Sequence, residues 1–157
     1  MVDVVQWVIF RLEEQRYALA LETVERIVQA VEITTLPKAP AIVLGVIAAG
    51  GQVIPVLNAR QRFQLTEREI RPSDHFLIAR TARRTLALVI DEAEGVVESS
   101  LREVVHAPKI VPGLEHVQGI ARLEEGLVLI HDLEKFLSLD EERLLDAALS
   151  QEARHGI

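Results

Sequence analysis

The sequence lacks cysteine altogether, and this absence removes several kinds of chemistry at once. Without a thiol the chain can form no disulfide, no thiolate metal site and no cysteine nucleophile, which is typical of proteins in a reducing cytoplasm. Aromatic residues make up only 4% of the 157 residues, and 24 acidic residues against 17 basic ones give a net charge of −7. Such a chain is poorly suited to bind phosphate backbones or to stack nucleic-acid bases.

The sequence also has little that resembles a membrane anchor. The first seven residues contain neither a basic region nor a long apolar stretch, so we expect no signal peptide. Residues 39–59 form a run of 21 residues without a charge, about the length that spans a bilayer. However, this run contains Pro40, Pro55 and the adjacent glycines Gly50 and Gly51. We therefore expect a tight hairpin between two buried strands, in a cytoplasmic protein.

What the sequence does contain is a series of short Val-, Ile- and Leu-rich runs separated by turn residues, which predicts a mainly β protein. Strands are expected at 5–12, 16–21, 28–34, 45–49, 52–57, 75–80, 85–90, 95–98, 117–123 and 126–131. Short helical segments are expected at 22–27, 58–63 and 140–149. Ser138 and Glu141 form a capping box before the last helix, and we expect residues 150–157 to be frayed.

An internal repeat relates the two halves of the chain. Residues 17–28 align with residues 86–97 without a gap, and the segment from Gly45 to Phe63 matches the segment from Gly119 to Phe136. Each half, of about 70 residues, would be marginally stable alone. We therefore expect two small β units whose apolar faces meet and leave a groove between them.

Residue patterns for catalysis are scarce. None of the five histidines has metal-ligand spacing, and the chain contains no Gly-x-Ser-x-Gly elbow, phosphate-binding loop or dinucleotide fingerprint. Asp91 and Glu92 lie at the end of an expected strand, where acid–base residues often lie, but an acidic residue after a buried strand is more often a solvated turn or a cap, and we expect that role here. We predict no catalytic residue, no metal ligand and no cofactor.

Several motifs that follow one another along the chain are informative together. They lie at residues 8–12, 17–19, 24–27, 36–40, 45–47, 51–57, 88–93 and 144–148. In their order and spacing they resemble the CheW-like family of chemotaxis coupling proteins and the related regulatory domain of the chemotaxis histidine kinase. The resemblance runs from about residue 5 to residue 149.

The resemblance implies a fold and a function. It implies one domain over residues 1–157, built from two intertwined SH3-like five-stranded β-barrels around a common core. Their expected limits are about 10–78 and 79–140, with a shared N-terminal strand and a C-terminal helix at about 140–149. It further implies a non-catalytic adaptor that couples a chemoreceptor to a histidine kinase, in the cytoplasm and at membrane-associated receptor arrays.

The resemblance also implies partner-binding positions. Val24 and Gly45 fall where the family packs against the kinase regulatory domain. A row of apolar residues falls along the groove expected to take the receptor's helical hairpin, a contact that needs such a row on a rigid scaffold. The core of a barrel would use the same side chains. The implied partner-binding residues are Val8, Leu21, Val24, Ile27, Gly45 and Gly51.

The sequence departs from the family pattern at two places on these surfaces. Residues 48–51 read Ala-Ala-Gly-Gly where the family has Asn-Leu-Arg-Gly, and Arg26 stands where the family commonly has Glu. Further along, residues 58–60 read Asn-Ala-Arg where the family has Asp-Leu-Arg, so only Arg60 matches the family pattern. Because charge on a binding surface selects partners, a specialised scaffold for a pilus-motility pathway or another kinase is an alternative function. A small nucleic-acid-binding barrel and an enzyme built on Asp91 and Glu92 are further alternatives.

Overall fold

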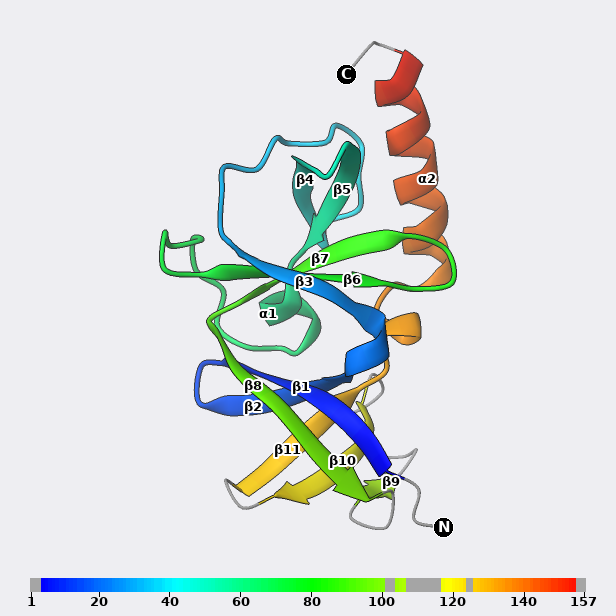
Figure 1. Ribbon diagram of the computed structural model, residues 1–157. Coiled ribbons are helices and arrows are strands. Elements are labelled where there is room, and N and C mark those ends of the chain that lie inside the picture. Colours follow the sequence, from blue (N-terminus) through cyan, green and yellow to red (C-terminus); the bar gives the residue numbers. More distant parts are fainter. Residues whose placement is uncertain (1–3, 101–103, 107–116, 124–125, 155–157) are drawn as a thin grey trace.

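The computed structural model describes residues 4–100, 104–106, 117–123 and 126–154 (Figure 1). The helical elements are η1 (Leu21–Thr23), α1 (Ala59–Arg62), η3 (Leu133–Lys135) and α2 (Leu139–Arg154). The strands are β1 (Val4–Leu12), β2 (Gln15–Ala20), β3 (Val24–Gln29), β4 (Val43–Ala49), β5 (Gln52–Leu57), β6 (His75–Arg80), β7 (Thr85–Ile90), β8 (Glu92–Ser100), β9 (Val104–His106), β10 (Val117–Leu123) and β11 (Gly126–His131). The protein is therefore mainly β, as its residue pattern predicted.

The strands form two sheets of the same topology. The upper sheet of Figure 1 has the order β3-β6-β7-β5-β4, and the lower sheet has the order β8-β1-β2-β11-β10-β9. Each contains one parallel pair, β5 with β7 above and β11 with β2 below. Strand for strand, the lower sheet repeats the upper one and adds β9 at its edge. The duplicated unit seen in the sequence is thus a duplicated sheet.

The two repeats exchange their first hairpins. The β1–β2 hairpin, which begins the first repeat, pairs with β8 and β11 of the second repeat. The β6–β7 hairpin, which begins the second repeat, pairs with β3 and β5 of the first. The chain therefore forms two intertwined SH3-like β-barrels, and the predicted fold class is confirmed.

Because of this exchange, the sheets do not divide the chain near residue 78. That position lies within β6, which belongs to the upper sheet together with β7. The chain instead passes from the lower sheet to the upper one at η1 and returns at Asp91, between β7 and β8. Local apolar patterns locate strands but do not identify their partners, which are set by contacts far apart in sequence.

Local structure around Leu21 differs from the prediction. The expected helix at 22–27 is only the short turn η1, and the expected strand at 28–34 begins four residues earlier, as β3. β3 pairs with β6 from Val24 to Gln29, with one irregularity between Val24 and Arg26. This pairing outweighs the weak local preference of its Glu and Arg residues for a helix. Strand β9 was not predicted.

Among the residues that the structure describes, three apolar clusters form the core. The largest lies between the sheets and includes Phe10 and Leu19 of the lower sheet and Leu77 and Leu88 of the upper one. A second cluster lies among the strands of the upper sheet, and a third surrounds Trp7 in the lower sheet. Tyr17, which stacks between Phe10 and Phe63, belongs to the shared cluster. Burial raises the pKa of its hydroxyl to about 12.

Helix α2 packs on the shared core through Leu145 and Ala148. Its start is the predicted capping box: the Glu141 N–H donates to Ser138 Oγ (3.1 Å), and the Ser138 N–H donates to Glu141 Oε1 (2.8 Å). The helix continues to Arg154, so the expected fraying from residue 150 is wrong for the part that the structure describes. None of the described helices has the length and apolar character needed to cross a membrane.

Candidate partner-binding surface

Four of the predicted partner-binding residues come together where the two sheets meet. Leu21 lies in η1 against β1, and Val24 begins β3. Together with Ile27 they are partly buried, and all three pack on the shared core, of which Val8 is a member. The four side chains therefore belong to one apolar cluster at the junction of the sheets, and their role in partner binding stays a prediction.

Val96, which the prediction did not include, extends this surface. On β8 it lies directly opposite Val8 of β1, so both side chains project to the same face of the lower sheet. Val8 is buried with 4% exposure, whereas Val96 is 54% exposed because β8 is the edge strand. We call Leu21, Val24 and Val96 the seam. The internal repeat carried a signal for Val96, since it aligns Val96 with Ile27.

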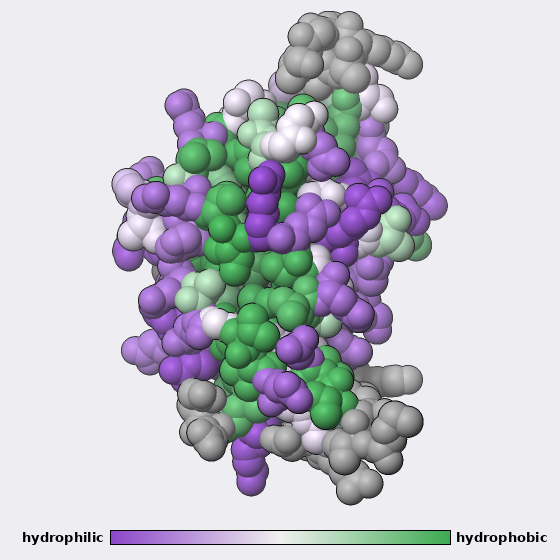
Figure 2. All heavy atoms as spheres, in the orientation of Figure 1, coloured by the Kyte–Doolittle hydropathy of each residue, from purple (hydrophilic) through white to green (hydrophobic). Residues whose placement is uncertain are grey.

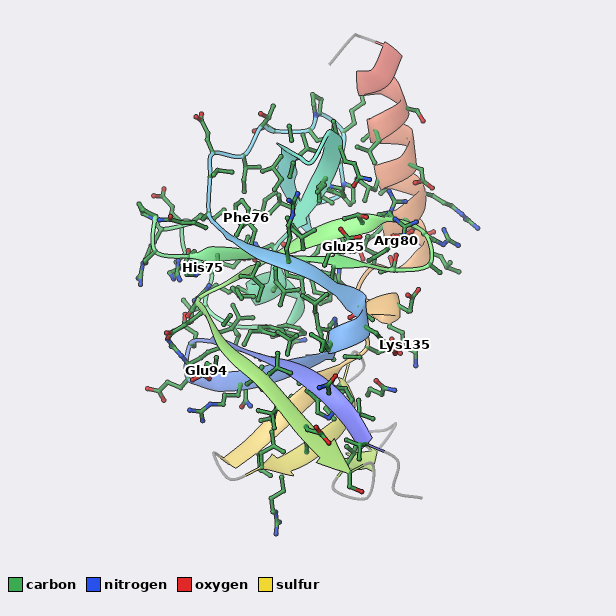
Figure 3. All side chains as sticks on the ribbon, viewed as in Figure 1. Glu25, His75, Phe76, Arg80, Glu94 and Lys135 are labelled. Carbon is green, nitrogen blue, oxygen red and sulfur yellow. The ribbon has the colours of Figure 1, made fainter. Side chains whose placement is uncertain are left out.

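The seam belongs to a longer apolar surface. Figure 2 shows a stripe of apolar atoms that runs down this face from the region of β4 and β5, across β3, to β1 and β8. Charged side chains from the surrounding elements lie at the borders of this face in Figure 3: Glu25 from β3, Glu94 from β8 and Lys135 from η3. Continuous exposed apolar surface with a polar border is typical of a protein-binding face.

Gly45 and Gly51, the two glycines among the predicted partner-binding residues, lie outside the seam and differ in burial. Gly45 of β4 is buried, with a φ of +155°, and a Cβ atom there would lie 2.3 Å from the backbone oxygen of Thr34. The fold therefore requires a residue without a side chain at position 45. Gly51 forms the exposed turn between β4 and β5 at a φ of +78°, and nothing lies within 4 Å of an added Cβ. This turn confirms the predicted hairpin.

Charged residues form a second junction between the sheets, which we call the Asp91 cluster. Arg60 of α1 is only 5% exposed, and its guanidinium contacts Asp91 at 2.7 Å and Glu13 of the β1–β2 turn at 2.9 Å. Arg68 contacts Asp91 at 2.9 Å and the buried Asp74 at 2.8 Å. The cluster therefore links the lower sheet, through Glu13, to α1 and the loop that leads into β6.

Asp74 has the strongest electrostatic support in this cluster. Burial by itself would raise the pKa of its carboxyl group. The hydrogen bonds from the Arg68 guanidinium and the Arg71 N–H outweigh burial and hold the pKa of Asp74 below its ordinary value. The same contact raises the pKa of Arg68. Both groups are therefore stabilised in their charged forms.

The structure gives no support to an active site at Asp91 and Glu92. Both line an open hollow of about 370 Å³. The Asp91 carboxylate, however, accepts hydrogen bonds from the Arg68 guanidinium and the Glu13 N–H and forms an ion pair with Arg60, and Glu92 is paired with Arg11 at 2.8 Å. A carboxylate whose oxygens are already occupied is poorly placed to take a proton from a substrate. Within the described ranges, no group of three or more His, Asp or Glu side chains could hold a metal ion.

Taken together, these features define a twin-barrel β protein whose prominent surface is an apolar face rather than a catalytic pocket. The model of the CheW-like domain matches residues 6–141, and the chain belongs to this family. The family membership expected from the sequence motifs is confirmed.

Similar proteins agree with this assignment. The chemotaxis protein CheW of Treponema pallidum is 28% identical over 142 residues, which cover 87% of this chain and 84% of that protein. Protein FrzA of Myxococcus xanthus is 27% identical over 119 residues, covering 72% of this chain and 71% of the other. The crystal structure of the scaffolding protein TtCheW from Thermoanaerobacter tengcongensis has the same fold, with a TM-score of 0.81 and 24% identity. That match covers 90% of this chain and 96% of the other.

Proposed function

We propose that this chain is a non-catalytic coupling adaptor of a chemotaxis-type pathway. In this role it joins the cytoplasmic tip of a chemoreceptor to the regulatory domain of a histidine kinase, in the cytoplasm at membrane-associated receptor arrays. The observation that carries the proposal is the seam, in which the exposed Val96 and the partly exposed Leu21 and Val24 present apolar side chains on a twin-barrel scaffold, in a chain of the CheW-like family.

The chemistry of the seam suits a helical partner. An amphipathic helix docks through apolar side chains spaced along one face, and it needs a row of apolar residues on a surface that does not rearrange. Leu21 and Val24 are fixed because they pack on the shared core, and Val96 is fixed by the β1–β8 pairing. Val8 is too deeply buried for a large contact, so we assign it the role of a core residue beside Val96. A receptor's helical hairpin fits this description.

A binding experiment on the seam tests the proposal. The probes are the receptor hairpin fragment and the kinase regulatory domain from the same organism, titrated by calorimetry against the full chain. We expect both to bind, and we expect Val24→Asp and Val96→Asp each to weaken binding of the hairpin about tenfold or more, since a charge would be buried in an apolar contact.

Leu127→Asp provides the matched control. Leu127 is 57% exposed on β11, outside the seam, so the same charge is introduced on an equally exposed apolar residue. We expect this variant to bind both probes as the wild type does. Wild-type protein that binds neither probe would refute the adaptor function. Folded seam variants that bind normally would show that the receptor docks elsewhere.

A further inference from the structure

Glu98 differs from the other two carboxylates of the edge strand β8. Glu92 is paired with Arg11 of β1, and Glu94 is paired with Arg16 of β2, each at 2.8 Å. Glu98 is exposed, and its carboxylate has no hydrogen-bond or ion-pair partner among the residues that the structure describes. The lower sheet therefore neutralises two charges of this strand and leaves that of Glu98 without a counterion.

Glu98 lies on the same face of the lower sheet as the seam. In the β1–β8 pairing, Val96 stands opposite Val8. Glu98 stands opposite Gln6, and the register between the two pairs is regular. Side chains two residues apart on a strand project to the same face, so Glu98 follows Val96 at about 7 Å along β8. Trp7, which lies between the two pairs, projects to the other face and packs in the cluster of the lower barrel.

Exposed apolar side chains lie on both sides of this carboxylate. Val96 is 54% exposed, and Val4, at the start of β1, is 48% exposed. Val4 and Gln6 are two residues apart on β1, so Val4 shares the face of Glu98. Figure 2 shows hydrophilic atoms within the lower part of the apolar stripe, over β1 and β8. The lower end of this face is therefore an apolar surface that carries the unpaired charge of Glu98.

A helix that covers the seam would remove water from Glu98. Losing water around an unpaired carboxylate is costly, whereas a guanidinium or ammonium group of the partner would replace that water with a charge-assisted hydrogen bond. In a helix that lies along β8, residues three or four positions apart are separated by about 5–6 Å, close to the spacing of about 7 Å between Val96 and Glu98. One face of a helix can therefore contact both residues.

We propose that Glu98 binds an arginine or lysine of the receptor's helical hairpin, three or four positions from the apolar residue that contacts Val96. The inference deepens the adaptor function proposed above and rests on it. The seam provides the apolar contact, and Glu98 selects a hairpin that has a basic residue in this register, because charge complementarity at the border of an interface sets which partner is accepted.

Substitutions of Glu98, titrated by calorimetry against the receptor hairpin fragment from the same organism, test the inference. Glu98→Gln should weaken binding about threefold, and Glu98→Lys about tenfold or more, because a like charge would then face the basic residue. Added salt should weaken binding of the wild type more than binding of Glu98→Gln. Glu14→Lys, the same charge reversal at an exposed position in the β1–β2 turn, is the control and should bind as the wild type does.

A charge exchange identifies the basic residue of the partner. Each arginine and lysine of the hairpin fragment is changed to Glu in turn, and every hairpin variant is titrated against the wild type and against Glu98→Lys. We expect one hairpin variant to bind the wild type weakly and to recover most of the lost affinity with Glu98→Lys, because the two charges are then exchanged.

The outcomes separate the inference from the function on which it rests. If wild-type protein does not bind the hairpin, the adaptor function fails and the inference fails with it. If the wild type binds and a folded Glu98→Lys binds equally well or more tightly, the contact at Glu98 is wrong while the adaptor function stands. If Glu98→Lys binds weakly and no hairpin variant recovers the affinity, the substitution does not act through a cation of the hairpin, and the inference is likewise wrong. Thermal unfolding of each variant shows whether it is folded.

Discussion

The two sheets meet at two chemically different junctions. At the seam, Leu21, Val24 and Val96 present apolar side chains that are only partly covered. At the Asp91 cluster, Arg60 and Arg68 hold carboxylates at distances of 2.7–2.9 Å, with Arg60 almost fully buried. Apolar contact is non-directional and leaves its outer surface free for a further partner. Bidentate guanidinium contacts are directional and are already satisfied.

The difference indicates a division of roles between the junctions. Ion pairs taken out of water contribute little net stability, but they tolerate few alternative geometries, so the Asp91 cluster is suited to fix how the sheets are oriented. The seam can then remain apolar and open on its outer side, while Leu21 and Val24 pack on the shared core on its inner side. Substitutions at the cluster should therefore change stability, and substitutions at the seam should change binding.

Arg60→Ala should give the largest loss of stability. Removing the guanidinium leaves Asp91 partly buried with one cation fewer, and breaking a buried ion pair from one side typically costs about 3 kcal/mol or more. Urea denaturation measures the change. Arg143→Ala, which breaks a solvent-exposed pair with Asp140, is the control and should change the free energy of unfolding by less than about 0.5 kcal/mol. Similar small effects for both variants would contradict the proposed role of the cluster.

Gly45→Ala should have the next largest effect, about 2 kcal/mol, because its Cβ would meet the Thr34 backbone oxygen at 2.3 Å and displace the chain there. Gly51→Ala is the matched comparison. It meets no neighbouring atom and is strained only by its positive φ, so it should cost about 1 kcal/mol. Thermal unfolding measures both. If Gly45→Ala is as stable as the wild type, then Gly45 is not required for packing and its predicted partner role regains priority.

Acid should weaken the charged contacts selectively. The pKa values of Asp74 and Glu141 are held below their ordinary values in the folded protein. Their contribution to stability is therefore complete above those ordinary values, and it is lost as the pH falls below about 4 and the carboxylates protonate. We expect the midpoint of urea denaturation to decrease in this range.

Two Asp→Asn variants identify the groups responsible for the acid effect. Asp74→Asn removes one titrating carboxylate and should make the midpoint of urea denaturation depend less steeply on pH below about pH 4. It should also lower the stability at neutral pH. Asp140→Asn changes a carboxylate that is 90% exposed and should leave the profile unaltered. A midpoint that does not change between pH 6 and pH 3 would show that these contacts do not stabilise the fold.

Much of the fold was predictable from local sequence patterns. Strands β5, β6, β7, β10 and β11 have the predicted bounds. In β5, β6, β7 and β11 the signal is an uninterrupted run of apolar residues, whereas the apolar residues of β10 are interrupted by Gln118, Gly119 and Arg122. The internal repeat predicted two equivalent units. The exchange of hairpins was not predictable from these patterns, since it depends on which strands pair. β3 was misjudged for a related reason, as its pairing with β6 decides its conformation.

The binding surface was predictable only in part. Apolar residues shared with the family indicated Leu21, Val24 and Ile27, but burial decides which of them a partner can reach, and Val8 is almost inaccessible. The sequence around Asp91 predicted a solvated turn. In the structure Asp91 is instead paired with Arg60 and Arg68, which are distant from it in the sequence. Proximity of this kind is a property of the folded chain alone.

Val96→Asp should have the smallest effect on stability and a large effect on binding. Because Val96 is 54% exposed on an edge strand, its carboxylate would remain hydrated, and the free energy of unfolding should change by less than about 0.5 kcal/mol. Urea denaturation and titration with the receptor hairpin, performed on the same preparation, give both quantities. A variant that loses stability as strongly as Arg60→Ala would show that the seam also holds the sheets together. The contrast between the two junctions would then be wrong, because one apolar surface would serve both the fold and the partner.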